Sequence, residues 1–560
     1  MRVRPPRLRL KPQTRQYSNS AARNNAKTKS SSTPKFDISP ATGQLLLIGG
    51  VVGWGIVAGL SIRSQLEEET WYEGLKHSWF TAKPTPNVTK AISMLKSVFP
   101  EQGRLLTDAK VLTSDAATQF LAYIGSEAAL PHKAIVFPQS TEDVVKIVKI
   151  CKSCNVSIVP RGSGTGLEGH ASGTTGDSIC IDLSQMDRII HINVADSDLT
   201  CQAGATWDGV NEILRKKGIP LFFPLDPASG SSLGGNLSTS CSGPNAVRYG
   251  TARGEWFLSA TVVLASGEVI KTRRRAHKSS AGFDLTQLFI GAEGTLGIVT
   301  EVTIKLAPAL PTTVALAHFP NVDFACRAVD ALLKSHSGMH IQCVELTDST
   351  FMKALNHSLS QSVTDRATRY PVSDTLFIKI QGSSIMQNDT LADIQRTLAQ
   401  YGCEDIRVAR GEEEADAMWG HRRGALPAIL GYIEGSQVWS TDVCVPVSNL
   451  ASLVRQVQED AAKAGIICPI VGHVGDGNFH AALIYRNPAE FSKVKELSRR
   501  IVERALELDG TCTGEHGVGV GKRQYLIPEL GTGTVELMKV IKKRLDPTNM
   551  MNPGKLYPSD

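Results

Sequence analysis

The sequence predicts an α+β protein with more than one domain. Its 560 residues can form several compact cores, and a content of 42% hydrophobic and 20% charged residues is typical of globular proteins. Up to about residue 310, short strand-like runs are joined by long loops rich in glycine and serine. After Pro311, strand-like and helix-like runs alternate instead. This change of pattern indicates a domain boundary near residue 311.

The charge balance and the cysteines exclude two classes of protein. Lys and Arg total 60 against 54 for Asp and Glu, so the net charge of +6 provides no basic field for nucleic acid. Eleven cysteines in so long a chain do not indicate a disulfide framework. Cys151 and Cys154 form a CxxC pair, which can bind a metal or undergo redox chemistry. They end an amphipathic run with Val144, Val145 and Val148, so we interpret them as ordinary helix residues.

Residues 1–40 have the composition of a mitochondrial presequence. The first 36 residues contain many Lys and Arg, several serines and no Asp or Glu. Prolines at positions 5, 6 and 12 interrupt any amphipathic helix, so a disordered basic tail is the alternative.

Residues 43–62 form an apolar segment that is long enough to cross a bilayer as a helix. Its glycines at positions 49, 53, 55 and 59 suit close helix packing in lipid. Basic residues precede the segment, and Glu67, Glu68 and Glu69 follow it. The positive-inside tendency then predicts an anchor in the mitochondrial inner membrane, with the large domain in the intermembrane space. A buried soluble helix and a cleavable sorting signal are the alternatives.

The stretch Val159–Ser178 is unusually rich in glycine. Its Gly164-x-Gly166-x-x-Gly169 pattern formally matches the dinucleotide-binding fingerprint. That fingerprint requires a helix directly after the glycines, but residues 178–183 have the pattern of a strand. A strand–loop–strand unit can still bind phosphate through successive backbone N–H groups. We therefore expect an anion-binding loop, with a flexible surface loop as the alternative.

Three glycine-rich segments together resemble the flavin-binding domain of the vanillyl-alcohol oxidase/p-cresol methylhydroxylase (PCMH) family. They are residues 159–178, 222–256 and 278–306, within a match to residues 130–310. The resemblance implies a two-subdomain PCMH-type FAD-binding domain, and noncovalent FAD because no histidine occupies positions 162–166. His170 is a possible exception. The implied cofactor contacts are Arg161, Gly162, Ser163, Gly164, Thr165, Gly166, Pro224, Gly234, Gly235, Ser238, Ser242, Asn245, Tyr249, Glu293, Gly294, Gly297, Ile298 and Asn552.

Two histidines flank a predicted β-hairpin. Apolar alternation surrounds a four-residue turn, Gly475 to Asn478, which pairs His473 with His480. Directly opposed residues share a face with Cβ atoms about 5 Å apart, so the two imidazoles could bind one metal ion. A lone pair of this kind more often has a purely structural role, which is the alternative. Further along the chain, Glu515 could complete an open-sided His₂Glu site.

The motifs after residue 130 resemble those of the FAD-dependent D-2-hydroxyacid dehydrogenases. They are TSCSGPNAVRYG, SAGFDLTQLFIGAEGTLGIVTE, GHVGDGNFH, GEHGVG and MNPGK, in that order. The resemblance implies that His473, His480 and Glu515 bind a divalent metal, with Zn, Mn or Fe as candidates, and that His516 is the catalytic base. The stretch MWGHRRGAL implies that Arg422 binds the substrate carboxylate.

The Arg422 assignment has two alternatives. Arg423 takes the role if the register is off by one. Alternatively, both arginines belong to a solvated basic helix end and have no functional role.

The same resemblance implies a reaction and an arrangement of domains. D-lactate would be oxidised to pyruvate, with a hydride passing to flavin N5 and electrons passing on to cytochrome c. A linker and helical region (63–129) would precede the FAD domain, and an α+β cap (311–510) and a C-terminal segment (511–560) returning to the flavin would follow.

Three other functions stay open. The substrate could be D-2-hydroxyglutarate or glycolate, with a quinone or flavoprotein as acceptor. A non-redox flavin transferase or a membrane-tethered flavoprotein without catalysis is possible on the same fold.

Overall fold

The structure is a computed structural model that describes residues 85–118, 130–363, 365 and 368–558. Every described residue belongs to one compact unit within Ser78–Asp560. The predicted presequence and the apolar segment 43–62 lie outside the described residues. Within the described ranges, no helix is long and apolar enough to cross a membrane.

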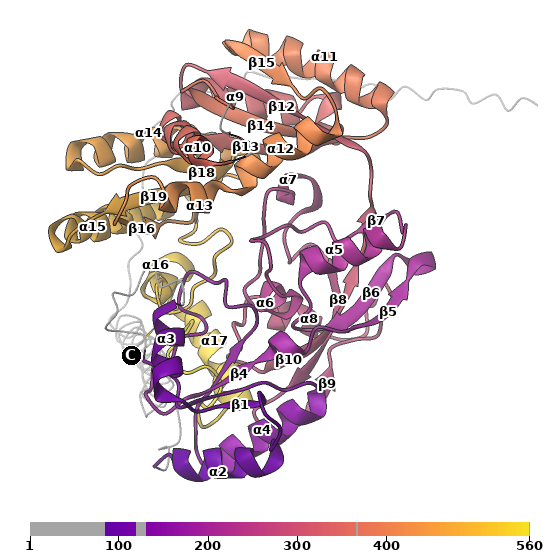
Figure 1. Cartoon of the computed structure of the whole chain (residues 1–560), viewed down its shortest axis with the longest axis vertical. Coiled ribbons are helices and arrows are strands. Elements are labelled where there is room, and N and C mark those ends of the chain that lie inside the picture. The colour runs from indigo at the N-terminus through magenta and orange to yellow at the C-terminus, as the bar shows by residue number, and fades with distance from the viewer. Residues whose placement is uncertain (1–84, 119–129, 364, 366–367, 559–560) are drawn as a thin grey trace, which may run out of the picture. The chain divides into compact units, whose positions relative to one another are not determined.

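The first half contains a small mixed sheet and a larger antiparallel sheet, with helices between the strands (Figure 1). The four-stranded sheet has the order β1-β2-β4-β3, in which β4 pairs parallel with β2 and β3. The five-stranded sheet has the order β5-β6-β10-β8-β9. The elements are α2 (Val88–Val98), β1 (Leu105–Leu106), α3 (Ala109–Thr118), β2 (Ala134–Val136), α4 (Thr141–Ser153), β3 (Ile158–Arg161), β4 (Ile179–Asp182), β5 (Ile189–Asn193), β6 (Asp198–Gln202), α5 (Trp207–Lys216), β7 (Leu221–Phe222), α6 (Leu233–Ser238), α7 (Ala246–Tyr249), β8 (Phe257–Val263), β9 (Val269–Lys271), α8 (Leu285–Phe289) and β10 (Ile298–Lys305).

Helix α4 contains the CxxC pair and shows why that pair is structural. Ser140 caps the helix by accepting a hydrogen bond from the Asp143 N–H, and acidic residues occupy its first turn. Cys151 and Cys154 are both buried in the hydrophobic core. The helical interpretation of these residues is therefore confirmed.

The glycine-rich stretch after β3 contains no helix. The chain runs irregularly from Gly162 to Ser178 and then enters β4, which pairs in parallel with β3. The dinucleotide fingerprint therefore fails on context, as the sequence predicts.

The second half is built on an eight-stranded sheet with the order β15-β12-β14-β13-β18-β19-β16, and β17 pairs with β19. Strand β11 pairs with β7 of the first half. The elements are β11 (Ala307–Pro308), β12 (Thr312–Phe319), α9 (Val322–Leu333), β13 (Ile341–Thr347), α10 (Ser349–Gln361), β14 (Asp374–Gln381), α11 (Ser384–Gln400), β15 (Asp405–Val408), α12 (Glu412–Arg423), α13 (Ala425–Leu430), β16 (Gln437–Ser440), β17 (Val443–Cys444), α14 (Val447–Ala464), β18 (Ile470–His473), β19 (Asn478–Tyr485), α15 (Pro488–Glu507), α16 (Leu526–Leu530) and α17 (Thr532–Leu545).

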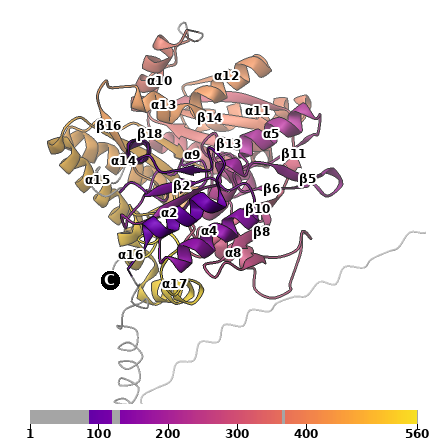
Figure 2. The ribbon, with the colours of Figure 1, turned by 60° about the horizontal axis from the view of Figure 1, so that its bottom comes forward.

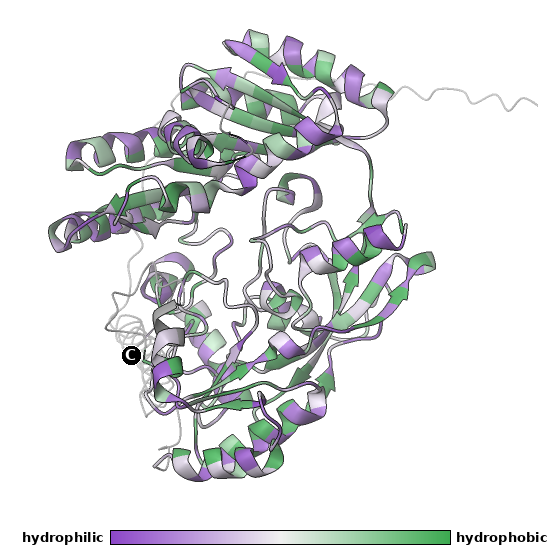
Figure 3. Cartoon of the chain, viewed as in Figure 1, coloured by the Kyte–Doolittle hydropathy of each residue, from purple (hydrophilic) through white to green (hydrophobic). Residues whose placement is uncertain are grey.

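Helices cover both faces of this large sheet. Along β14, Leu376 and Ile378 pack into the core formed with α9, α11, α14 and α15, whereas Phe377 packs into the core formed with α10, α12 and α13. Successive strand residues point to opposite faces, so both faces of β14 must be apolar. The strands are accordingly mostly hydrophobic along their length, while the helices alternate in hydropathy (Figure 3).

The C-terminal segment returns to the first half of the molecule. Met551 forms a parallel bridge with Ile158, the first residue of β3. The Ile158 N–H donates to Met550 O and the Asn552 N–H donates to Ile158 O, each at 2.8 Å. Helix α17 also packs against the core of the first half, beside its N-terminal elements in both views (Figures 1 and 2). The chain thereby brings Asn552 next to the first glycine-rich loop.

Candidate functional site

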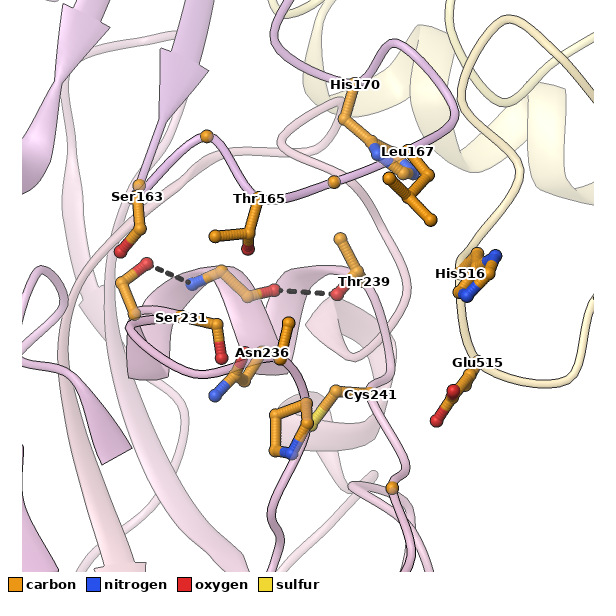
Figure 4. Close-up of a pocket in the computed structure, with 18 of the residues that line it drawn as sticks. Ser163, Thr165, Leu167, His170, Ser231, Asn236, Thr239, Cys241, Glu515 and His516 are labelled. Atoms are coloured by element: carbon orange, nitrogen blue, oxygen red, sulfur yellow. Dashed lines mark hydrogen bonds between the residues drawn. The ribbon is translucent and has the colours of Figure 1, made fainter. Parts of the chain in front are cut away.

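A cavity of about 540 Å³ lies between the two halves of the described unit. One wall comes from the glycine-rich segments of the first half, and the other comes from α12, α13, β18, β19 and the loop after α15. Figure 4 shows Glu515 and His516 on one side of this space and the loop with Ser163 and Thr165 on the other.

Most of the residues that the sequence assigns to the cofactor line this cavity. They come from three separate segments and from the C-terminal return. They are Arg161, Gly162, Ser163, Gly164, Thr165, Gly166, Gly234, Gly235, Ser238, Ser242, Glu293, Gly294, Gly297, Ile298 and Asn552.

Three of the assigned residues do not line the cavity. Asn245 is buried, and its side chain donates to Pro224 O at 2.7 Å, so both residues fix a turn behind the wall. The Tyr249 hydroxyl donates to Gln381 at 2.8 Å and therefore joins the two halves of the molecule. The motif located the correct segment, but these side chains point into its packing instead of the cavity.

The glycines of the first wall pack closely against the protein's own atoms, and two polar atoms of the wall lack a partner among the described residues. A Cβ on Gly162 would lie 2.0 Å from Ser232 Oγ, and a Cβ on Gly234 would lie 2.6 Å from Ala203 Cβ. Ser231 Oγ and Asn236 Nδ2 face the cavity, and among the described residues neither atom has a hydrogen-bond partner. Buried polar groups are normally satisfied, so these two atoms fit a bound polar group such as a cofactor. The sequence prediction of FAD is consistent with this wall.

The predicted hairpin is present, but its register differs from the prediction. His473 pairs with Asn478, and His480 pairs with Val471, so residues 474–477 form the turn. The predicted pairing of His473 with His480 is therefore wrong by two residues. A shift of two preserves the side-chain face because strands alternate with a period of two. The two imidazoles consequently still meet, with ring centroids 5.4 Å apart.

The two histidines converge on a carboxylate from the last segment. Glu515 Oε1 lies 3.1 Å from His473 Nε2 and 3.1 Å from His480 Nε2. The ligand atoms of these three residues all lie within 4.8 Å of one another, as do those of Asp442, His480 and His516. The first set is open to the cavity, whereas Asp442 is fully occupied by hydrogen bonds. His₂Glu therefore fits a catalytic divalent metal better.

The other ring nitrogens of both histidines are held by the protein. His473 Nδ1 lies 2.9 Å from Glu345 Oε1, and His480 Nδ1 lies 3.1 Å from Thr441 O. Such partners orient ligand imidazoles in metal sites. Glu345 was not identified from the sequence. Its only local signal is a carboxylate inside β13, where every residue is buried.

Arg422 lies at the same place and is also bound by Glu345. The guanidinium and the carboxylate form a buried ion pair. Arg422 lines the cavity, and its buried Nε lacks a hydrogen-bond partner within the described ranges. Arg423 also lines the cavity, but its side chain is 45% exposed and lies 3.5 Å from Asp226.

The charges of the site are strongly coupled. Burial opposes the charge of Glu515, but the neighbouring imidazoles of His473 and His480 hold the pKa of its carboxyl well below its usual value. Burial also opposes protonation of His473, but Glu345 and Glu515 raise its pKa. At His516, burial dominates and lowers the pKa of the imidazole to about 4. The His516 ring stacks on His480 with centroids 4.7 Å apart.

Asp442 is a second residue that sequence patterns did not reveal. It lies between β16 and β17 and is buried. Its carboxylate accepts hydrogen bonds from the backbone N–H groups of Glu515 and His516 at 3.0 and 2.8 Å. A lone aspartate near a strand carries no motif, so only the tertiary structure shows this role.

Comparisons with known proteins agree with this geometry. A family model described as "FAD binding domain" matches residues 131–273, and one described as "FAD linked oxidases, C-terminal domain" matches residues 311–556. The chain is 40% identical over 482 residues to D-lactate dehydrogenase (cytochrome) 1, mitochondrial, of Saccharomyces cerevisiae, which covers 84% of this chain and 80% of that protein. It is 40% identical to D-lactate dehydrogenase (cytochrome), mitochondrial, of Arabidopsis thaliana, with 76% and 75% covered.

A solved structure shows the fold. The structure of p-cresol methylhydroxylase with substrate bound superposes with a TM-score of 0.65 at 16% identity, covering 84% of this chain and 96% of that one. The α+β PCMH-type FAD-binding fold that the sequence predicts is therefore confirmed.

The fold and the family models define an FAD-linked oxidoreductase. More narrowly, the chain belongs to the family of FAD-linked oxidases that includes the D-lactate dehydrogenases (cytochrome).

Proposed function

We propose that this protein oxidises D-lactate to pyruvate and passes the electrons to cytochrome c. The observation that carries the proposal is that both sets of residues line the same cavity. It is lined by the FAD-type glycine loops on one side and by His473, His480, Glu515 and His516 on the other. D-lactate and a cytochrome appear in the names of the yeast and plant relatives, and cytochrome c is our choice for that cytochrome.

The FAD site in this proposal is the glycine wall of a domain spanning residues 130–310, completed by Asn552. Unpartnered polar atoms and glycines that tolerate no side chain support it. FAD, when bound, accepts the α-hydrogen of the substrate with its electron pair. Residues 311–510 form the cap in this proposal, and residues 511–560 return the chain to the flavin.

The metal site in this proposal consists of His473, His480 and Glu515. The converging donor atoms and the held Nδ1 atoms of both histidines support it. A divalent cation, when bound, lowers the pKa of a coordinated hydroxyl group. The donor set suits Zn, and Mn and Fe remain candidates.

The protein's own residues bind the substrate and remove one proton. Arg422 binds the carboxylate, because it lines the cavity and its Nε has no hydrogen-bond partner among the described residues, while Glu345 holds its other end. His516 takes the hydroxyl proton, since its Nδ1 lies in the cavity wall and has no hydrogen-bond partner within the described part of the chain. D-lactate thus loses the hydroxyl proton to His516 and the α-hydrogen with two electrons, leaving pyruvate. Two molecules of cytochrome c are needed to take the two electrons.

The proposed location is supported by the composition of the N-terminal sequence and by the word mitochondrial in the names of the relatives. Residues 1–40 direct the chain to mitochondria, and residues 43–62 anchor it in the inner membrane with the enzyme facing the intermembrane space. Retention of the protein in carbonate-washed mitochondrial membranes tests the anchor, and full release would contradict it.

Anaerobic reduction of the purified holoenzyme tests the reaction. D-lactate is expected to bleach the flavin absorbance, and L-lactate is expected to leave it unchanged. Oxidised cytochrome c, added after D-lactate, should then restore the flavin absorbance. If D-2-hydroxyglutarate or glycolate bleaches the flavin faster than D-lactate does, that acid is the preferred substrate. If none of the three bleaches it, the protein is not an active dehydrogenase for these acids.

A further inference from the structure

The loop Thr513–Gly519 carries both Glu515 and His516, and it lies between the two halves of the described unit. It belongs to neither half by its own secondary structure, because it contains no helix or strand. Its position must therefore be set by contacts from outside. Two buried carboxylates, one from each half of the unit, accept the backbone N–H groups of residues 515, 516, 518 and 519.

On the cap side, Asp442 binds the first part of the loop. Its carboxylate accepts the backbone N–H groups of Glu515 and His516, and it also accepts the Thr513 hydroxyl at 2.7 Å. Asn478 Nδ2 and Lys522 Nζ donate to the same carboxylate at 3.0 and 3.3 Å. Asp442 is only 1% exposed, so these bonds form away from water.

On the FAD side, Glu293 binds the second part of the loop. Oε1 accepts the Val518 N–H at 2.7 Å and Oε2 accepts the Gly519 N–H at 2.8 Å. Glu293 is 4% exposed and lines the cavity, and Asn552 donates to its backbone carbonyl at 2.7 Å. The same residue therefore borders the cofactor wall and holds the loop that carries the metal and base candidates.

The loop has little room to move between these two carboxylates. A Cβ on Gly514 would lie 2.3 Å from Asn478 Nδ2, one on Gly517 would lie 2.9 Å from Glu293 Oε1, and one on Gly519 would lie 2.1 Å from Glu168 O. Lys522 adds a third tie, because its ammonium lies 2.9 Å from Glu168 of the first glycine-rich loop. The GEHGVG sequence thus supplies both the reactive side chains and the small residues that let the backbone seat closely.

We propose that Asp442 and Glu293 are positioning residues that clamp the loop Thr513–Gly519 from opposite halves of the unit. They set the place of Glu515 and His516 relative to the cofactor wall without touching the substrate. The clamp gives each carboxylate its own segment, residues 515–516 for Asp442 and residues 518–519 for Glu293. The catalytic meaning of the clamp rests on the proposed function, but the clamp itself does not.

Amide hydrogen exchange in the full-length holoenzyme tests the clamp directly. Asp442→Asn is expected to speed exchange of the Glu515 and His516 N–H groups about 10- to 100-fold, since a charge-assisted bond is lost. Glu293→Gln is expected to speed exchange of the Val518 and Gly519 N–H groups by a similar factor. Asp374→Asn is the matched control, because Asp374 is a buried cap carboxylate that accepts the Ser349 N–H at 2.9 Å and accepts no hydrogen bond from this loop.

Metal affinity provides the functional readout. In protein stripped of metal and titrated with Zn²⁺ against a chelator, Asp442→Asn and Glu293→Gln are each expected to weaken binding about 10- to 100-fold. Asp374→Asn should bind Zn²⁺ as the wild type does. If Asp442→Asn does not fold, Thr513→Val removes one bond to Asp442 and one to Gly517 O within the loop, and it should give a smaller change in the same direction.

Two results would overturn the clamp. Unchanged exchange at residues 515–519 in both variants would show that the carboxylates do not hold the loop. An equal change in Asp374→Asn would show that any buried carboxylate has the same effect. Both readouts work without substrate, so a wild-type protein that D-lactate fails to reduce would refute the proposed reaction and leave the clamp to be decided by exchange.

Discussion

The two walls of the cavity are built differently. The FAD wall is mostly backbone and glycine, drawn from continuous segments such as residues 161–166. The opposite wall combines apolar residues of α13 with charged and imidazole side chains from α12, β18, β19 and the loop after α15. The backbone wall provides shape and N–H donors, whereas the side-chain wall provides ligands and a proton acceptor.

This difference predicts which kind of substitution disrupts each wall. A glycine wall fails when a side chain is added, because the added atom occupies space that the ligand or a neighbour needs. A side-chain wall fails when a functional group is removed, because its partners stay buried and unpaired. Changes in the first wall should therefore affect cofactor retention, and changes in the second should affect turnover.

The largest effect is expected from His516→Ala. Loss of the proton acceptor should lower kcat for D-lactate about 10²- to 10⁴-fold while the FAD content stays at the wild-type level. Stopped-flow bleaching of the flavin measures both the rate and the amount of bound FAD. Reduction at the wild-type rate would show that another group takes the proton.

Glu345→Gln should have the next largest effect. The substitution leaves Arg422 buried without its counter-ion and loosens the Nδ1 contact of His473. We expect kcat/KM for D-lactate to fall about 10- to 100-fold with FAD retained. Steady-state kinetics at saturating metal provide the measurement, and a wild-type value would remove Glu345 from the site.

Gly234→Ala should break the opposite wall. The added methyl group would lie 2.6 Å from Ala203 Cβ and 2.9 Å from Ala203 O, so the backbone must shift at a cost of about 1–3 kcal/mol. The purified protein should contain less FAD per chain, as absorbance shows. Gly533→Ala is the matched control, since no described atom lies within 4 Å of its added Cβ. Equal FAD content in both variants would contradict the close fit of this wall.

Lys555, which is buried where the C-terminal segment meets the FAD half, should make the free energy of unfolding depend on pH. Burial lowers the pKa of its ammonium to about 7, against about 10.4 in an unfolded chain. Between these values the unfolded chain binds more protons, so stability rises with pH. The free energy of unfolding should increase by roughly 1–3 kcal/mol from about pH 7 to about pH 9, relative to Lys555→Met. Urea denaturation of both proteins at both pH values measures this increase. The same change with pH in the wild type and in Lys555→Met would contradict the lowered pKa of Lys555.

The smallest effect is expected from Tyr249→Phe. The substitution removes one hydrogen bond between the halves, to Gln381, and should cost about 1 kcal/mol of stability. FAD content should not change, because Tyr249 does not line the cavity. A clear loss of FAD would show that Tyr249 contributes to cofactor binding after all.

The parts that could be predicted from the sequence are those that local patterns determine. The amphipathic spacing of Val144, Val145 and Val148 identifies α4, and apolar alternation around a glycine turn identifies the β18–β19 hairpin. The missing helix after the glycine-rich loop excludes the dinucleotide fold by the same kind of reasoning. In each case the deciding residues lie within about one turn or strand of one another.

The remaining features depend on contacts between distant residues. Glu345 lies 77 residues from Arg422 and 128 from His473 in the sequence, so no local pattern joins them. The hairpin register was also undetermined, because a shift of two keeps the same face toward the site. Asn245 and Tyr249 show the same limit, since a motif identifies a segment but not which side chains reach the cavity.

The central claim is that the two walls act on one substrate. Anaerobic stopped-flow reduction by D-lactate, in holoenzyme stripped of metal and then reloaded with Zn²⁺, tests it most directly. The account predicts that stripping retains the FAD but slows bleaching at least about 100-fold, and that reloading restores the rate. Equal bleaching rates in the stripped and reloaded protein would show that the His473, His480 and Glu515 wall takes no part in the reaction.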